Sequence, residues 1–195
     1  MKEYYSYYEN TDKDDADKTN PATSSQASST DKLQQQLYCG KLTRVKDFNE
    51  TFELVKLAVD TKFKMHRAGL SLVLQVLPTQ PGAYHVLGSN MIIMNKRILD
   101  IIKSKKSLLE YNAYLFMVLC HEYLHSFGII DENQVRRMTY HLCMSLLGET
   151  HPSTQMARYQ PWKVFPELQL YQSSTVENNF EIIKNFDKTT QSYIN

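Results

Sequence analysis

One stretch, residues 108–127, constrains the fold of this chain more than any other. It contains no proline or glycine and is largely apolar, and Ser107 and Glu110 at its start form the capping-box pattern of a helix N-terminus. Gly128 follows it, a residue that often ends a helix because it readily adopts a left-handed backbone conformation. These signals predict one long, mostly apolar helix.

Three ionisable residues, His121, Glu122 and His125, interrupt this apolar helix. Residues four positions apart lie on the same face of a helix, so both imidazoles can reach one zinc ion at about 2.0–2.1 Å. Glu122 projects about 100° around the helix, where its carboxylate can take a proton from a zinc-activated water. Burying these residues without a partner is costly, which favours a zinc site over two half-exposed histidines and a solvated glutamate. The pattern predicts hydrolysis with Glu122 as general base.

The motif His121-Glu122-x-x-His125 resembles the signature of the zincin metallopeptidases. The resemblance spans roughly residues 45–150 and implies a small zincin-like core with zinc as cofactor and a peptide or protein as substrate. It also implies a strand at the edge of the cleft that the substrate joins by backbone pairing. Residues 83–87 and 91–94 are the two candidates for that strand.

A third metal ligand is expected beyond Gly128. Residues 121–131 read H-E-Y-L-H-S-F-G-I-I-D, which resembles the metzincin pattern with Asp131 at the place of its third histidine. The glycine lets the chain turn back toward the metal, and aspartate is an acceptable zinc ligand, so Asp131 is the favoured candidate. The same residue also fits as the N-cap of the next helix.

Other residues compete with Asp131 for this role. His151 follows Gly148 in a Gly-x-x-His spacing that resembles the third ligand of SprT-like zincins, and it is the main alternative. Glu132 and His141 are further candidates. Sequence alone leaves these alternatives open.

Several polar residues outside the motif are expected to have structural or surface roles. Arg136 and Arg137 are predicted to lie on a solvated helix face rather than to bind a substrate carboxylate. Tyr84, His85 and Tyr140 are weaker candidates for stabilising an oxyanion, and packing is the favoured role for each.

Apolar periodicity predicts the remaining elements of an α+β domain with a small, mostly antiparallel or mixed sheet packed on helices. The expected helices cover residues from about 45 to 64, from about 95 and from about 131 to 148, and the expected strands cover 70–77, 83–87 and 91–94.

Composition divides the chain into three parts. Residues 1–32 are polar and poor in core-forming side chains, which predicts a disordered tail. Residues 33–150 form the predicted zincin-like domain. Residues 151–195 are more polar again and are expected to be an extension with one short amphipathic helix at about 180–186.

Charge and cysteine content narrow the functional classes. The 22 basic and 21 acidic residues nearly cancel, giving a net charge of +1, so a broad nucleic-acid surface is not expected. The three cysteines form no C-x-x-C pair and are expected to be reduced. No apolar signal-peptide core and no run of about 18 apolar residues is found, so we expect a cytoplasmic protein with no membrane partner.

Two alternative functions remain. The spacing through Gly128 also resembles the YbeY family, linked to ribosomal RNA cleavage, and would imply a metal-dependent endoribonuclease. That family typically has glycine at the position of Glu122, so the glutamate favours peptidase chemistry. The other alternative is a non-catalytic zincin-like binding module.

Overall fold

The computed structural model describes residues 29–78, 80, 82–171 and 174–187. Most of the predicted polar tail, residues 1–28, lies outside this range, whereas residues 29–32 belong to a helix. The elements in chain order are α2 (Ser29–Leu42), α3 (Phe48–Phe63), β1 (Ser71–Gln75), β2 (Ala83–His85), β3 (Met91–Asn95), α4 (Lys96–Lys105), α5 (Leu108–His125), α6 (Glu132–Leu147), α7 (Pro152–Tyr159), α8 (Pro161–Val164), the short 3-10 helix η1 (Pro166–Tyr171) and β4 (Phe180–Ile183). The predicted α+β class is confirmed.

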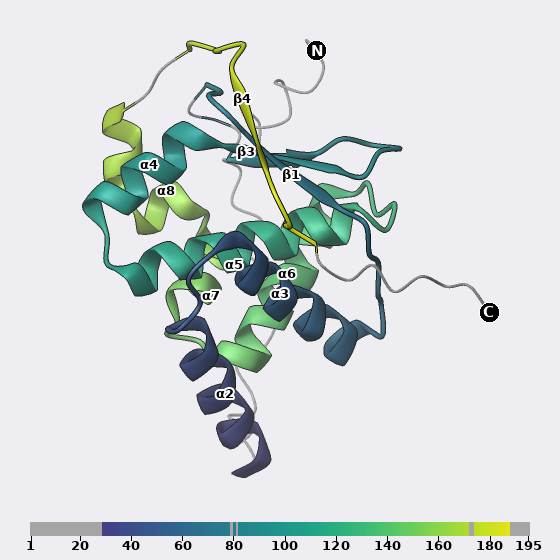
Figure 1. Cartoon of the computed structure of the whole chain (residues 1–195). Helices are drawn as coiled ribbons and strands as arrows, with labels where there is room; N and C mark the ends of the chain where they lie inside the picture. Colours follow the sequence, from purple (N-terminus) through teal and green to yellow (C-terminus); the bar gives the residue numbers. More distant parts are fainter. Residues whose placement is uncertain (1–28, 79, 81, 172–173, 188–195) are drawn as a thin grey trace, which may run out of the picture.

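The four strands form one mixed sheet with the order β2-β3-β1-β4. β1 and β3 run parallel, while β2 and β4 pair antiparallel with β3 and β1 respectively. In Figure 1 the sheet lies on one side of the molecule, and α5 runs beneath it with α3, α6 and α7 around the helix. β2 is therefore an edge strand, and it contacts α5 directly.

Helix α5 is the centre of the core, and its observed ends match the sequence signals. The Ser107 hydroxyl accepts a hydrogen bond from the Glu110 backbone N–H at 3.3 Å, and the Ser107 backbone donates to the Glu110 carboxylate at 2.9 Å. At the other end Gly128 has a φ of +85° and donates to the carbonyl of His125 at 2.9 Å. Twelve consecutive or near-consecutive side chains between these ends are buried, so the helix is enclosed on most of its circumference.

The C-terminal region differs from the sequence prediction. The amphipathic helix expected at about 180–186 is wrong, because residues 180–183 form β4, an antiparallel partner of β1. Phe180 and Ile182 alternate with Glu181 and stay largely exposed at 64% and 59%, as on the open face of an edge strand. The four apolar residues of this segment, Phe180, Ile182, Ile183 and Phe186, fit the periodicity of a helix as well as that of a strand. The segment forms a strand because it pairs with β1.

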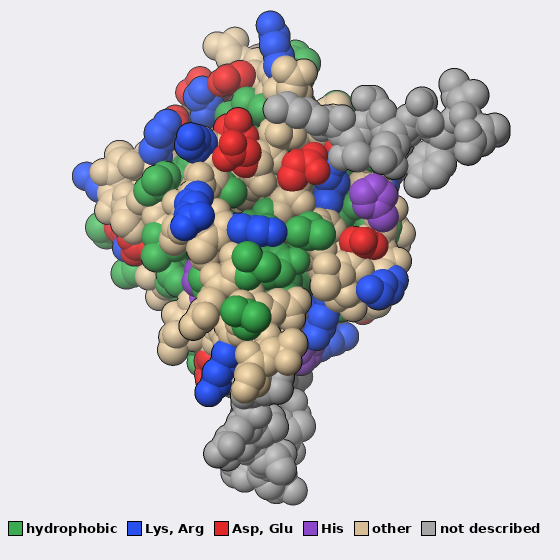
Figure 2. Space-filling model, turned by 60° about the horizontal axis from the view of Figure 1, so that its bottom comes forward, with side chains coloured by type: hydrophobic (Ala, Val, Ile, Leu, Met, Phe, Trp, Pro, Cys, Tyr) green, Lys and Arg blue, Asp and Glu red, His purple; other side chains and the backbone are tan. Residues whose placement is uncertain are grey.

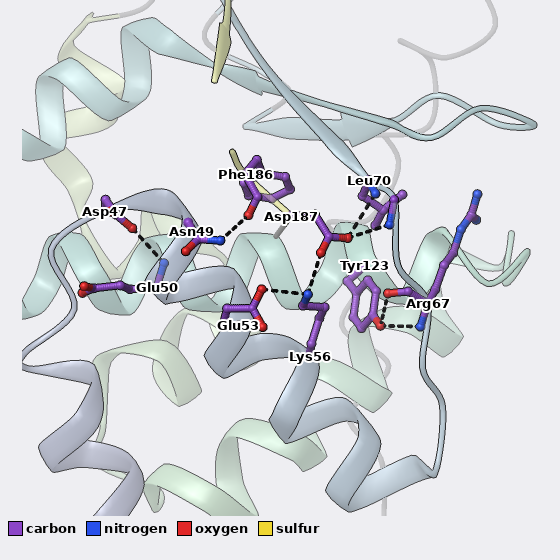
Figure 3. Close-up of polar contacts among 11 residues, drawn as sticks. Asp47, Asn49, Glu50, Glu53, Lys56, Arg67, Leu70, Tyr123, Phe186 and Asp187 are labelled. Carbon is purple, nitrogen blue, oxygen red and sulfur yellow. Dashed lines mark hydrogen bonds and ion pairs between the residues drawn. The ribbon is translucent and has the colours of Figure 1, made fainter. Parts of the chain in front are cut away.

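A buried ion pair fixes the segment after β4 to the rest of the domain (Figure 3). Asp187 Oδ1 lies 2.6 Å from Lys56 Nζ on α3, and these side chains are only 1% and 3% exposed. Asp187 Oδ2 accepts hydrogen bonds from the backbone N–H groups of Gly69 and Leu70, at 2.8 and 3.1 Å. One carboxylate thus ties the end of the described chain to α3 and to the start of β1.

We expect Asp187→Ala to lower the free energy of unfolding by about 3 kcal/mol, because it leaves the buried Lys56 ammonium group without this carboxylate. The matched control is Glu181→Ala, which removes an ion pair with Lys96 whose side chains are 55% and 41% exposed. That variant should lose less than about 1 kcal/mol. Urea denaturation of both variants gives the comparison, and equal losses would contradict the dominant role of the buried pair.

Candidate metal centre

Three side chains, two from the last turns of α5 and one from the start of α6, converge at the C-terminal end of α5. The Nε2 atoms of His121 and His125 lie 3.2 Å apart, and Glu132 Oε2 lies 3.3 Å and 3.2 Å from them. Glu132 is the first residue of α6, and the turn at Gly128 brings it back over the last turn of α5. Among the described residues this is the one group of three or more His, Cys, Asp or Glu donors whose atoms all lie within 4.8 Å of one another.

The separations between these donor atoms fit a zinc ion. The donors of a tetrahedral zinc at about 2.0–2.1 Å lie about 3.3 Å from one another. The three observed separations, 3.2, 3.2 and 3.3 Å, agree with this value. Two histidines and a glutamate form a donor set that catalytic zinc sites use, with a fourth position left open, whereas structural sites are usually closed by four Cys or His ligands.

The protonation states of the ligands also suit a cation. His125 Nδ1 lies 2.7 Å from the carbonyl oxygen of Ile129 and donates its proton to that oxygen, so Nε2 is the ring atom that faces the centre of the group. Burial alone would raise the pKa of the Glu132 carboxyl, but the hydrogen bonds with His121 and His125 hold that pKa well below its usual value. The contact between His125 Nε2 and the ionised Glu132 carboxylate requires a positive charge between the two atoms, either a proton or a metal ion.

The favoured third ligand of the sequence analysis, Asp131, faces its own helix. Its Oδ1 accepts a hydrogen bond from the backbone N–H of Gln134 at 3.0 Å, so it is the N-cap of α6. The carboxylate beside the imidazoles belongs to the next residue, Glu132, which the sequence offered only as a lesser candidate. The sequence already indicated that Asp131 could cap α6. With its carboxylate bonded to the backbone of its own helix, the next residue, Glu132, is the acidic side chain that faces the imidazoles of α5.

The other two candidates lie away from the imidazoles. His151 is the N-cap of α7, where its Nδ1 accepts from the backbone N–H of Ser153 at 3.2 Å, and it does not line the cleft that contains the imidazoles. His141 is exposed, further along α6. The structure therefore brings neither of them to the group.

Glu122 lies beside the candidate ligands in a buried position. Its side chain is 5% exposed and lines the same cleft as His121 and His125. Burial raises the pKa of its carboxyl, although the two imidazoles oppose this effect, and the carboxylate accepts a hydrogen bond from the backbone of His85. The side chain is thus held between the edge strand β2 and the candidate metal ligands.

These residues line a cleft with a volume of about 560 Å³. Its walls come from the edge strand β2, the middle of α5, the first turns of α6 and the α7–α8 region. Besides His121, Glu122 and His125, the lining includes Ala83, Tyr84 and His85 of β2, the cap residue Asp131, and Glu132, Arg136 and Thr139 of α6.

The edge strand is β2, because β3 lies between β2 and β1. Two backbone hydrogen bonds on either side of β2 point toward β3. The Asn95 N–H donates to the carbonyl of Gly82 at 2.8 Å, and the Val86 N–H donates to the carbonyl of Met91 at 3.0 Å. Hydrogen-bonding directions alternate along a strand, so the backbone groups of Ala83 and His85 face away from β3. Of the two candidate edge strands, residues 91–94 are therefore excluded and the segment that begins at Ala83 remains.

The side chains weighed for oxyanion stabilisation have different surroundings. His85 is buried, with Nε2 3.2 Å from the carbonyl oxygen of Ser89, and burial lowers its pKa. Tyr84 is half-buried and lines the cleft, whereas the Tyr140 ring lies tilted against the His141 ring and does not line it. His85 Nε2 is thus engaged with its own hairpin turn, while His85 also lines the cleft.

Arg67 fastens the motif helix to the β2–β3 turn. Its guanidinium donates hydrogen bonds to the carbonyl of Ser126, directly after His125, to the carbonyl of Ser89 and to the Asn90 side chain. The backbone of Arg67 also exchanges hydrogen bonds with the Tyr123 hydroxyl, at 2.7 and 2.9 Å (Figure 3). Two walls of the cleft are therefore held in a fixed relation.

Comparisons of the chain with protein-family models, with curated proteins and with solved structures found no match. In the part of the chain that the structure describes, no helix combines the length and the apolar character needed to cross a membrane.

His151 provides a pH test of its assignment as a buried cap. Burial lowers its pKa from 6.5 to about 4, so the unfolded chain binds a proton at a higher pH than the folded one. The free energy of unfolding should therefore fall as the pH drops from about 6.5 toward 4. Between pH 7.5 and 5, the metal-free wild type should lose about 1–2 kcal/mol more than His151→Asn, which keeps a cap acceptor but does not titrate. Urea denaturation at both pH values measures the difference, and identical losses would show that His151 is not held neutral.

Proposed function

We propose that this chain is a zinc-dependent metallopeptidase in which His121, His125 and Glu132 hold the metal and Glu122 is the general base. The observation that carries the proposal is the group of three donor atoms at 3.2–3.3 Å with a buried carboxylate beside it in one cleft. Zinc, when bound, supplies a Lewis acid that polarises a carbonyl group and makes a water molecule acidic near neutral pH.

The chain's own residues have separate roles in this proposal. The raised pKa of Glu122 suits a group that accepts a proton and later delivers it to a leaving amine. The hydrogen bond from the His85 backbone orients its carboxylate, and the hydrogen bond from His125 Nδ1 to Ile129 orients that imidazole. The backbone groups of Ala83 and the carbonyl of His85 remain open for pairing with an extended peptide, since the His85 N–H is bonded to Glu122. Such a peptide would lie across the candidate metal ligands.

The composition of the cleft favours a peptide over an RNA substrate. Its described lining includes three acidic residues, Glu122, Asp131 and Glu132, and a single basic residue, Arg136. Binding to a phosphate backbone relies on several lysines and arginines, so these acidic groups oppose the YbeY-like alternative. Basic and acidic side chains are also interspersed on the face drawn in Figure 2, in keeping with the net charge of +1.

The ligand assignment is tested by metal content. Wild-type protein supplied with zinc should hold about one zinc per chain, and His125→Ala should hold none. Loss of a residue that only hydrogen-bonds to a metal ligand weakens metal binding by roughly 10–100-fold, and we expect Glu132→Gln to weaken zinc binding by more than this. Asp131→Asn keeps the helix cap and loses only the charge, so it should bind zinc as the wild type does. Plasma mass spectrometry and competition with a chromogenic chelator provide the measurement. The opposite order of these two variants would identify Asp131 as the ligand.

The reaction is tested with Glu122→Gln. This variant should retain zinc and lose at least about 100-fold in peptide cleavage, because the general base is gone while the metal ligands are intact. Cleavage of a mixed peptide library, followed by mass spectrometry, provides the readout, with Asp131→Asn as an active control. A zinc-loaded wild type that cuts no peptide would support the non-catalytic module instead, and cleavage of RNA that requires zinc would support the endoribonuclease.

A further inference from the structure

Arg136 is the one basic side chain among the described residues of the cleft. It lies four positions after Glu132 and three before Thr139, so the three residues share the face of α6 that borders the cleft. Arg136 is half-buried, whereas Arg137, about 100° around the helix, is exposed. The predicted solvated face is therefore confirmed for Arg137 but not for Arg136.

The Arg136 guanidinium has no hydrogen bond, ion pair or ring contact within the described part of the chain. The three carboxylates that line the same cleft are engaged elsewhere. Glu132 faces the two imidazoles, Asp131 caps α6, and Glu122 accepts from the backbone of His85. A guanidinium carries five N–H donors in a planar fork, and a half-buried one without an acceptor favours a ligand that supplies one.

We infer that Arg136 binds a carboxylate of the substrate, so that the cleft selects peptides with a carboxylate close to the bond that is cut. The inference rests on the proposed function and names the substrate class of that site. A carboxylate matches the guanidinium fork with two parallel charge-assisted hydrogen bonds, which gives orientation as well as affinity.

The spacing on α6 sets where that carboxylate lies along the substrate. Side chains four positions apart on a helix are separated by about 5–6 Å at their Cβ atoms, so the Arg136 side chain starts roughly one turn of α6 away from the candidate ligand Glu132 and borders the same cleft. An extended peptide spans about 3.3–3.6 Å per residue. The carboxylate therefore lies one or two residues from the scissile bond, and it belongs either to the chain terminus or to an aspartate or glutamate side chain.

Binding of metal-directed probes tests this assignment without turnover. The probes are two matched pairs of succinyl hydroxamates, one coupled to alanine as free acid or as amide, the other to aspartic acid amide or to asparagine amide. Calorimetry on the zinc-loaded full chain should show about tenfold or tighter binding for the carboxylate-bearing member of at least one pair. The first pair reports a terminal carboxylate and the second an acidic side chain.

Substitutions assign the preference to the guanidinium. Arg136→Met keeps the length of the side chain and should abolish the acid-over-amide preference, while its matched neighbour Arg137→Met should retain it. Arg136→Lys, which keeps the charge but not the fork, should retain a reduced preference. Zinc content and melting temperature of each variant check that it folds, and the wild-type comparison of acid with amide needs no variant at all.

The outcomes separate this inference from the proposed function. If both members of each pair bind the wild type alike, or if Arg136→Met keeps the preference, the assignment of Arg136 is overturned and the metal centre stands. If no hydroxamate binds the zinc-loaded chain, the proposed centre fails and the assignment of Arg136 fails with it.

Discussion

The burial of α5 fixes the direction of every side chain at its C-terminal end. Large residues such as Phe116, Leu119 and Tyr123 are fully enclosed, so the helix cannot rotate about its axis without displacing the core. The same helix carries His121 and His125, which emerge where α6 and the edge strand β2 leave a cleft. Packing of the core therefore sets the geometry of the candidate metal centre before any ligand enters it.

The short connection between α5 and α6 completes the centre through its backbone. Gly128 adopts a positive φ and reverses the chain, and the Ile129 carbonyl then meets His125 Nδ1. Two residues after Ile129, Asp131 caps α6, which commits its carboxylate to the backbone and places Glu132 over the imidazoles. The glycine turn and these two local interactions thus bring a third donor to two that the helix already aligns.

Local signals in the sequence predicted the elements that local interactions determine. The capping box at Ser107, the glycine at 128 and the i, i+4 histidines act over a few residues, and the helices and strands between about 45 and 148 appear close to their predicted limits. β4 was missed because its partner is β1, roughly a hundred residues earlier in the chain. The sequence ranked Glu132 below Asp131 because two adjacent acidic residues fit the spacing equally well, and only the direction of the cap distinguishes them.

The ion pair between Lys56 and Asp187 has a consequence for how the protein is made. Lys56 leaves the ribosome 131 residues before its partner. Until Asp187 is made, the Lys56 ammonium group has, among the described residues, only the partly exposed carboxylate of Glu53 as an ion-pair partner. We therefore expect Lys56 and the start of β1 to take up their final packing only once the last described residues of the chain are present.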